Sequence, residues 1–184
     1  MYGGTDGTEA LDELWVYDEA NDSWELLNTI GTSPGPRQGH VAAALGNVLI
    51  IWGGKNGSTV YKDMFMYNTN TNVWEEVQVK STVNPTAAEG ACMVVYEEEI
   101  YIFGGINKGK LNNKLWKFNI GSYKYESLDI TDTKNKPDGV SYSNCWAIGH
   151  TLYIANGILE TLNSPKSVWR YNLKNPKWET KVPS

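Results

Sequence analysis

The stretch Val48-Leu49-Ile50-Ile51-Trp52-Gly53-Gly54 decides the fold, because an apolar run closed by two glycines returns along the chain. The closing pairs are spaced about fifty residues apart, a period that is typical of repeat proteins. They are Gly3-Gly4, Gly53-Gly54, Gly104-Gly105 and, with asparagine in the first position, Asn156-Gly157. The sequence therefore predicts one structural unit that is repeated along the chain.

Aromatic residues follow the glycine pairs with the same period. Each pair precedes a short apolar and aromatic segment that is typical of a strand, at residues 14–18, 64–68, 115–119 and 168–172. Seven residues beyond the tyrosine or phenylalanine of each segment stands one more aromatic residue, at Trp24, Trp74, Tyr125 and Trp178. Turn-forming residues such as Asn70-Thr71-Asn72 lie between the two, so each unit is predicted to contain a β-hairpin here.

Two further strands precede each glycine pair. In the second unit they span residues 40–45 and 48–52 and are joined by Gly46-Asn47, so each unit is predicted to hold four antiparallel strands. The first strand carries small or medium residues, as in Val41-Ala42-Ala43-Ala44, whereas the last strand carries a large aromatic residue. This gradient suits a β-propeller blade, because inner strands crowd near the axis and outer strands diverge.

The glycine pair, followed by tyrosine and tryptophan at set distances, resembles the kelch repeats over essentially the whole chain. The segment Pro36-Arg37-Gln38-Gly39-His40 also resembles the segment that leads into the inner strand of many cytosolic kelch proteins, and we call it the lead-in segment. Its later copies, at residues 88–91 and 140–143, have lost the pattern, and Tyr125 replaces the expected tryptophan. The resemblance implies an all-β, kelch-type β-propeller of about four blades.

The expected units are a partial blade at residues 1–33, which lacks its inner strand, and blades at 34–84, 85–137 and 138–184. Kelch propellers close with more blades than this, so the resemblance implies part of a larger propeller or completion by another chain. An open propeller would expose apolar faces at both ends, which predicts self-association.

Composition and charge exclude several classes of partner. The 16 basic and 21 acidic residues give a net charge of −5, and the basic residues are scattered, so neither nucleic acid nor an anionic membrane is an expected partner. The N-terminus shows no signal peptide, and no apolar run is long enough to span a membrane. We therefore expect a cytoplasmic protein. Cys92 and Cys145 lie in apolar runs and are expected to pack in the core as unlinked thiols.

Catalytic and metal chemistry find little support in the sequence. Gly104–Lys110 matches part of a phosphate-binding loop, but Leu111 stands where that loop needs serine or threonine, and a strand follows instead of a helix. His40 and His150 occupy different repeat positions and are not expected to share a metal. We predict no catalytic residue, no metal and no cofactor. An enzyme or metal-dependent factor on a propeller scaffold remains the less favoured alternative.

The kelch resemblance implies a protein-interaction module that binds a peptide or protein partner. In that family an arginine such as Arg37 often lies at the rim of the central pocket, where its guanidinium suits a peptide carboxylate. A structural bond to a neighbouring blade is an equally weighted alternative for Arg37. Loops after the glycine pairs should open on the same face, and the further candidate contacts are Gln38, Asp6, Asn56, Ser58, Asn107 and Lys108. A third possibility is a structural piece of a larger assembly.

Overall fold

The computed structural model describes residues 1–128, 136–165 and 167–181, and every regular element in these ranges is a β-strand. The first sheet has the order β1-β2-β3 and is built from β1 (Tyr2–Thr5), β2 (Ala10–Asp18) and β3 (Ser23–Leu26). The second has the order β4-β10-β9-β6-β5, with β4 (Ile30–Gly31), β5 (Val41–Leu45), β6 (Val48–Trp52), β9 (Met64–Asn68) and β10 (Val73–Glu76).

The third sheet has the order β11-β12-β14-β15, with β11 (Glu89–Tyr96), β12 (Glu99–Asn107), β14 (Leu115–Asn119) and β15 (Lys124–Ser127). The fourth has the order β16-β17-β18-β19, with β16 (Asn144–Ile148), β17 (Thr151–Ala155), β18 (Val168–Asn172) and β19 (Lys177–Lys181). Two short hairpins follow glycine pairs: β7 (Lys55–Asn56) pairs with β8 (Thr59–Val60), and β13 (Lys110–Leu111) pairs with the end of β12.

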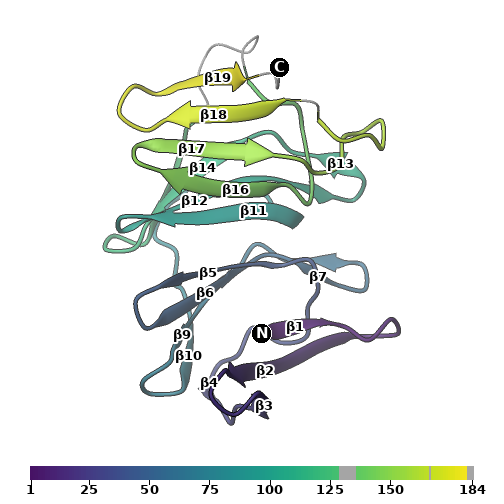
Figure 1. Ribbon diagram of the computed structural model, residues 1–184, viewed down its shortest axis with the longest axis vertical. Coiled ribbons are helices and arrows are strands. Elements are labelled where there is room, and N and C mark those ends of the chain that lie inside the picture. The colour runs from purple at the N-terminus through teal and green to yellow at the C-terminus, as the bar shows by residue number, and fades with distance from the viewer. Residues whose placement is uncertain (129–135, 166, 182–184) are drawn as a thin grey trace.

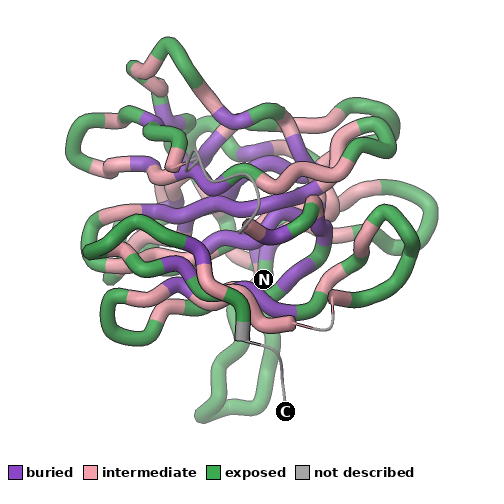
Figure 2. Tube along the Cα trace, turned by 90° about the horizontal axis from the view of Figure 1, so that it is seen from above, coloured by how far each residue is buried: buried purple, intermediate pink, exposed green. Residues whose placement is uncertain are grey.

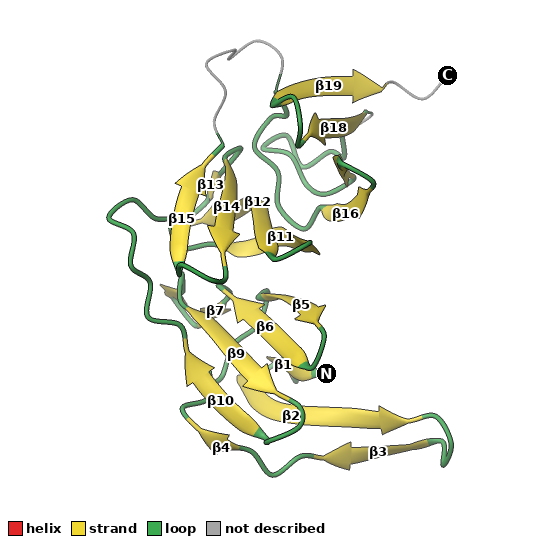
Figure 3. Ribbon diagram, turned by 90° about the vertical axis from the view of Figure 1, so that its left-hand side faces the viewer, coloured by secondary structure: helices red, strands yellow, loops and turns green. Residues whose placement is uncertain are grey.

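The sheets follow one another along the long axis of the molecule, from β1–β3 at one end to β16–β19 at the other (Figure 1). The inner strands β5, β11 and β16 are neighbours in this series, and Figure 3 shows the same succession from the side. The prediction of all-β blades is confirmed, as is the missing inner strand of the first blade, where the sheet begins with β1. The unit boundaries remain predictions, and the expected C-terminal limit at residues 182–184 lies outside the described residues.

Apolar side chains fill the space between each pair of neighbouring sheets. Buried residues are concentrated in the strands and exposed residues in the surrounding loops (Figure 2). The outer-strand aromatics Trp74, Tyr125 and Trp178 are buried against the preceding sheet. Trp24 occupies the same repeat position but is 55% exposed, because no sheet of this chain precedes the first. The aromatic residues predicted from the repeat are therefore the packing between blades.

The glycine pairs form hydrogen-bonded joints between successive sheets. The second glycine of each of the first three pairs donates its N–H to a carbonyl that precedes the next inner strand: Gly4 to Arg37 at 2.9 Å, Gly54 to Ala88 at 2.9 Å, and Gly105 to Val140 at 2.8 Å. Gly53 has a φ of +67°, and a Cβ there would lie 2.6 Å from the Ala88 carbonyl oxygen. Both the backbone conformation and the close neighbour therefore require glycine.

One strand departs from the expected units. β4 falls within residues 1–33, yet it pairs in parallel with β10, the outer strand of the second sheet. The register places Ile30 opposite Val73 and Gly31 opposite Trp74. This pairing covers the backbone edge that β10 would otherwise expose, which is a common protection of edge strands. No feature of the repeat predicts it, because it depends on the path between two units.

The expectation of two unlinked thiols is corrected. Cys92 in β11 and Cys145 in β16 form a disulfide between the inner strands of the third and fourth sheets, with their Cα atoms 5.9 Å apart. This separation lies in the usual range for a disulfide. Each cysteine lies in the inner strand of its sheet. The sequence could not show that β11 and β16 turn these two side chains toward each other, because that depends on the packing of separate blades.

Candidate interaction face

Three hairpin tips carry most of the predicted contact residues. The β1–β2, β7–β8 and β12–β13 hairpins project toward the same edge of the molecule, at the right of Figure 1. Asp6, Asn56, Ser58 and Lys108 are exposed at these tips, whereas Asn107 is half-buried. The Asp6 carboxylate accepts the N–H groups of its own turn, which lowers the pKa of that carboxyl group. Partner binding by these residues remains a prediction.

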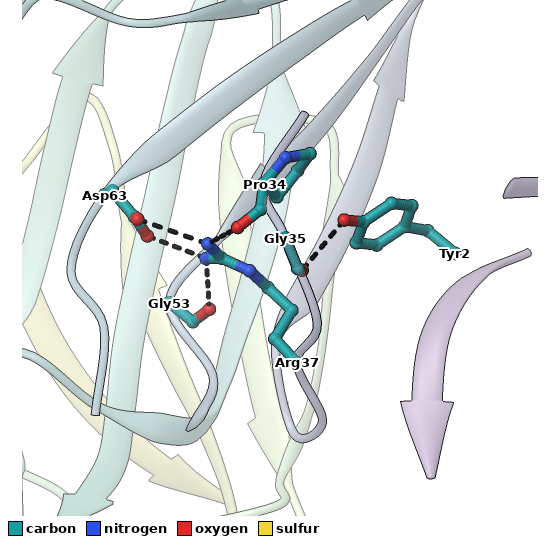
Figure 4. A network of polar contacts seen from close by, with 6 residues as sticks. All are labelled: Tyr2, Pro34, Gly35, Arg37, Gly53 and Asp63. Atoms are coloured by element: carbon teal, nitrogen blue, oxygen red, sulfur yellow. Dashed lines mark hydrogen bonds and ion pairs between the residues drawn. The ribbon is translucent and has the colours of Figure 1, made fainter. Parts of the chain in front are cut away.

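Arg37 is an intramolecular group in this structure. Its side chain is 1% exposed, and its Nη1 donates to Asp63 Oδ1 at 2.7 Å and to the Gly53 carbonyl at 3.0 Å. Its Nη2 donates to Asp63 Oδ2 at 3.2 Å and to the Pro34 carbonyl (Figure 4). The Tyr61 ring lies 4.4 Å from the guanidinium carbon, within the range of a cation–π contact.

The carboxylate bound by Arg37 is therefore the protein's own Asp63, and binding of a partner by Arg37 stays a prediction. The structural alternative is favoured, with one difference. The side chain of Arg37 binds groups of its own sheet, and it is the Arg37 backbone carbonyl that bonds the neighbouring sheet through Gly4. A bidentate, buried guanidinium is a rigid support for the lead-in segment.

The two histidines lie in separate surroundings. His40 packs edge-on against Tyr2, with ring centroids 5.7 Å apart, at the joint between the first and second sheets. Burial, followed by the charge of Arg37, lowers the pKa of His40 to about 4, so its imidazole is neutral near pH 7. His150 Nδ1 lies 2.7 Å from the Tyr96 hydroxyl in the turn between β16 and β17. Within the described ranges, no three histidine, cysteine, aspartate or glutamate side chains gather to hold a metal ion.

A chain of polar contacts crosses the three lead-in segments. The backbone of Gln38 exchanges hydrogen bonds with Lys55 of β7, at 2.8 and 2.9 Å. Lys55 Nζ lies 2.9 Å from Glu89, whose other carboxylate oxygen accepts the Tyr142 hydroxyl at 2.8 Å. Burial and the Glu89 carboxylate raise the pKa of Tyr142 to about 12, so this hydroxyl stays a donor. Lys55, Glu89 and Tyr142 were missed by sequence reasoning because the lead-in pattern is lost after its first copy.

A cavity of about 560 Å³ opens beside the β12–β13 hairpin. Residues 83–88, which connect β10 to β11, form one wall, and the hairpin with the start of β14 forms the other. Asn107 and Lys108, both predicted as contacts, lie in this wall beside Trp116. The sequence shows Trp116 only as an aromatic residue of the strand predicted at 115–119, and no sequence pattern shows that a blade aromatic also faces a cavity.

The phosphate-loop resemblance has a plain structural explanation. Gly104–Asn107 ends β12, Lys108 and Gly109 form a turn, and Lys110–Leu111 is β13, which is followed by strand β14. A helix N-terminus, which a phosphate-binding loop requires, does not follow these residues. No helix in the described part of the chain has the length and hydropathy needed to cross a bilayer.

Stacked antiparallel sheets with hydrogen-bonded glycine joints and outward hairpins define part of a β-propeller. Residues 1–184 match the KLHDC2/KLHL20/DRC7 Kelch-repeats domain family, and the chain belongs to this family. It is 28% identical to the Leucine-zipper-like transcriptional regulator 1 homolog of Drosophila melanogaster, over 97% of this chain and 19% of that protein. It is 29% identical to human Host cell factor 1, over 74% of this chain and 7% of that protein.

A third relative, from Thlaspi arvense, is named N-(sulfonatooxy)prop-2-enimidothioate sulfolyase and is 24% identical over 80% of this chain. The chain covers 44% of that protein, so it spans less than half the length of each of these relatives. The kelch-repeat family and relatives such as Host cell factor 1 support a protein-interaction module, and one relative carries the name of an enzyme.

Proposed function

We propose that the hairpin tips on one edge of this kelch-repeat chain form a surface that binds a peptide or folded protein partner. The observation that carries the proposal is the common direction of the β1–β2, β7–β8 and β12–β13 hairpins (Figure 1). Exposed loops on a rigid scaffold are the usual place for specificity, because they can vary without disturbing the core. The glycine joints and the buried Arg37–Asp63 pair supply that rigidity.

A loop-face variant tests this proposal. Asn56→Ala, Ser58→Ala and Lys108→Asn change three tip residues, and Lys124→Ala with Lys174→Ala is the control, since both lysines are exposed away from these tips. Wild-type, loop-face and control chains of matched melting temperature are used for affinity purification, and each recovered partner is tested again in purified form. We expect the loop-face variant alone to lose binding. Equal partner recovery with all three chains would refute the proposal.

A second candidate function is assembly through the end sheets. On the first sheet Tyr17 and Trp24 are 42% and 55% exposed, and on the last sheet Ile148 is 63% exposed. Exposed apolar surface of this kind marks association sites. We propose self-association, or completion by another chain, through these faces. Sedimentation at rising protein concentration tests it: a constant monomer mass would exclude self-association, and Trp24→Glu should lower the association of a chain that does assemble.

We further propose a cytoplasmic chain that binds neither nucleic acid nor membranes. The net charge of −5 supports the absence of a nucleic-acid role, because phosphate backbones need basic surfaces. The Cys92–Cys145 disulfide is an argument against a reducing compartment, where such bonds are rare. Fractionation of cells that express the chain, with thiol labelling before lysis, would decide between these two indications.

A further inference from the structure

The cavity beside the β12–β13 hairpin has the size of a binding site for a side chain or a small group of side chains. Its volume of about 560 Å³ lies within the range of ligand pockets. Val83, Ala88, Leu111 and Trp116 supply apolar surface to its lining. Val83 is 63% exposed, although it is a large apolar residue. The cavity can therefore accept an apolar side chain.

Two residues of the cavity lining each carry a buried polar atom that lacks a hydrogen-bond partner within the described residues. The Nε1–H of Trp116 has no acceptor, although the Trp116 side chain is 95% buried, being 5% exposed. The Oδ1 of Asn107 has no donor and is also buried. Leaving a buried polar group unpaired costs about 1–3 kcal/mol. A ligand that offered an acceptor to Trp116 and a donor to Asn107 would remove this cost.

The charge around the cavity is positive, although the whole chain is acidic. Lys108, Lys110 and Lys114 line it, and none of the described lining residues is an aspartate or glutamate. Neither Lys108 nor Lys110 forms an ion pair with a described carboxylate. In a chain of net charge −5 this is a local exception. Complementary charge selects partners and speeds their encounter, so the cavity favours an anionic ligand.

We propose that this cavity binds an acidic peptide segment of a protein partner. An apolar side chain of the segment enters beside Val83 and Trp116, and neighbouring carboxylates pair with Lys108 and Lys110. An acceptor of the segment binds the Trp116 Nε1–H, and a backbone N–H binds Asn107 Oδ1. This assignment rests on the proposed interaction function and names the ligand class of one part of the loop face.

Peptide titration followed by NMR tests the assignment. The ¹⁵N-labelled 184-residue chain is titrated with a pool of hexapeptides in which one leucine is flanked by glutamates, and with a matched pool in which glutamines replace the glutamates. We expect the indole N–H signal of Trp116, identified by its loss in Trp116→Phe, to shift with the glutamate pool. The glutamine pool should bind about tenfold more weakly, since each exposed ion pair contributes up to about 1 kcal/mol.

Charge variants test whether Lys108 and Lys110 bind the glutamates of the peptide. Lys108 has a φ of +48° and precedes Gly109, so Lys108→Asn keeps the backbone preference of the turn while it removes the charge. Lys108→Asn with Lys110→Gln should weaken binding of the glutamate pool about tenfold. Lys124→Ala with Lys174→Ala, which lies outside the cavity lining, should leave binding unchanged.

Three results would overturn the assignment: no shift of the Trp116 signal, equal binding of the glutamate and glutamine pools, or full binding by the Lys108→Asn, Lys110→Gln chain. If the cavity fails in this way while the Asn56, Ser58 and Lys108 variant still loses its partner, the acidic-peptide assignment alone is wrong. If that variant and the wild-type chain recover equal amounts of partner, the interaction face is refuted, regardless of the result of the peptide titration. The two failures are therefore distinguishable.

Discussion

Reduction of the Cys92–Cys145 disulfide should destabilise the chain by an amount set by the loop that the bond closes. The two cysteines are 53 residues apart. Closing a loop of that length removes unfolded-state entropy worth about 4 kcal/mol at 25 °C. A chain of 184 residues has an unfolding entropy of about 2 cal/mol/K per residue, so the melting temperature should fall by about 10 °C.

Differential scanning fluorimetry with and without a phosphine reductant measures this change. The matched control is the double variant Cys92→Ala, Cys145→Ala, whose melting temperature should not respond to the reductant. The unreduced wild-type chain, unfolded in guanidinium, should give no maleimide adduct by mass spectrometry, and the reduced chain should give two. Two adducts before reduction would refute the bond. A melting temperature that the reductant leaves unchanged in both chains would refute the stabilisation expected from closing the loop.

Three further predictions concern the lead-in segment and the joints between sheets. Asp63→Asn leaves the buried Arg37 guanidinium without its charged partner and should cost about 3 kcal/mol in urea unfolding; a loss under about 1 kcal/mol would contradict the structural role of the pair. The pKa of His40 falls from 6.5 to about 4 on folding because burial disfavours the charged imidazole. The free energy of unfolding should therefore be unaffected by His40 above pH 6.5 and should decrease as the pH falls toward 4, by up to about 3 kcal/mol. His40→Gln should remove that part of the pH dependence of the urea midpoint, and parallel profiles for the two chains would contradict it. Gly54→Ala places a Cβ 2.8 Å from the Gln38 carbonyl oxygen at a φ of +90° and should cost about 2 kcal/mol or more, whereas Gly57→Ala, at positive φ in open space, should cost about 1 kcal/mol; equal melting temperatures for the two variants would disprove the joint.

The sheets could be predicted from sequence because each depends on local signals. Strand length, turn residues and the glycine pairs lie within one unit, and the aromatic of each outer strand packs at a constant place in the repeat. The contacts between units could not be predicted in the same way. The pairing of β4 with β10 and the meeting of Cys92 with Cys145 depend on how separate blades pack.

The candidate site was predictable only in part, for a related reason. The hairpin tips follow the glycine pairs, so Asn56, Asn107 and Lys108 were placed on loops from their position in the repeat. The role of Arg37 could not be deduced from its position, since its partner Asp63 stands 26 residues later in a connection that no repeat signal marks. The contact of Trp116 with the cavity could not be predicted for the opposite reason, because its position in the repeat is already accounted for by packing between blades.

The structure separates the residues that hold the blades together from those that can vary for recognition. At each joint a glycine N–H binds the segment leading into the next inner strand, and at Gly54 and Gly105 a Cβ would lie only 2.8 Å from its nearest neighbour. A few residues further on, Gly7, Gly57 and Gly109 at the hairpin tips have open space where a side chain would lie. Because the joint fixes where each hairpin leaves the sheet, the tip can change its chemistry without moving its base. Under the proposed function a partner would therefore be selected by tip residues and by the cavity beside the β12–β13 hairpin, because the strands and glycine joints of the repeat serve the fold.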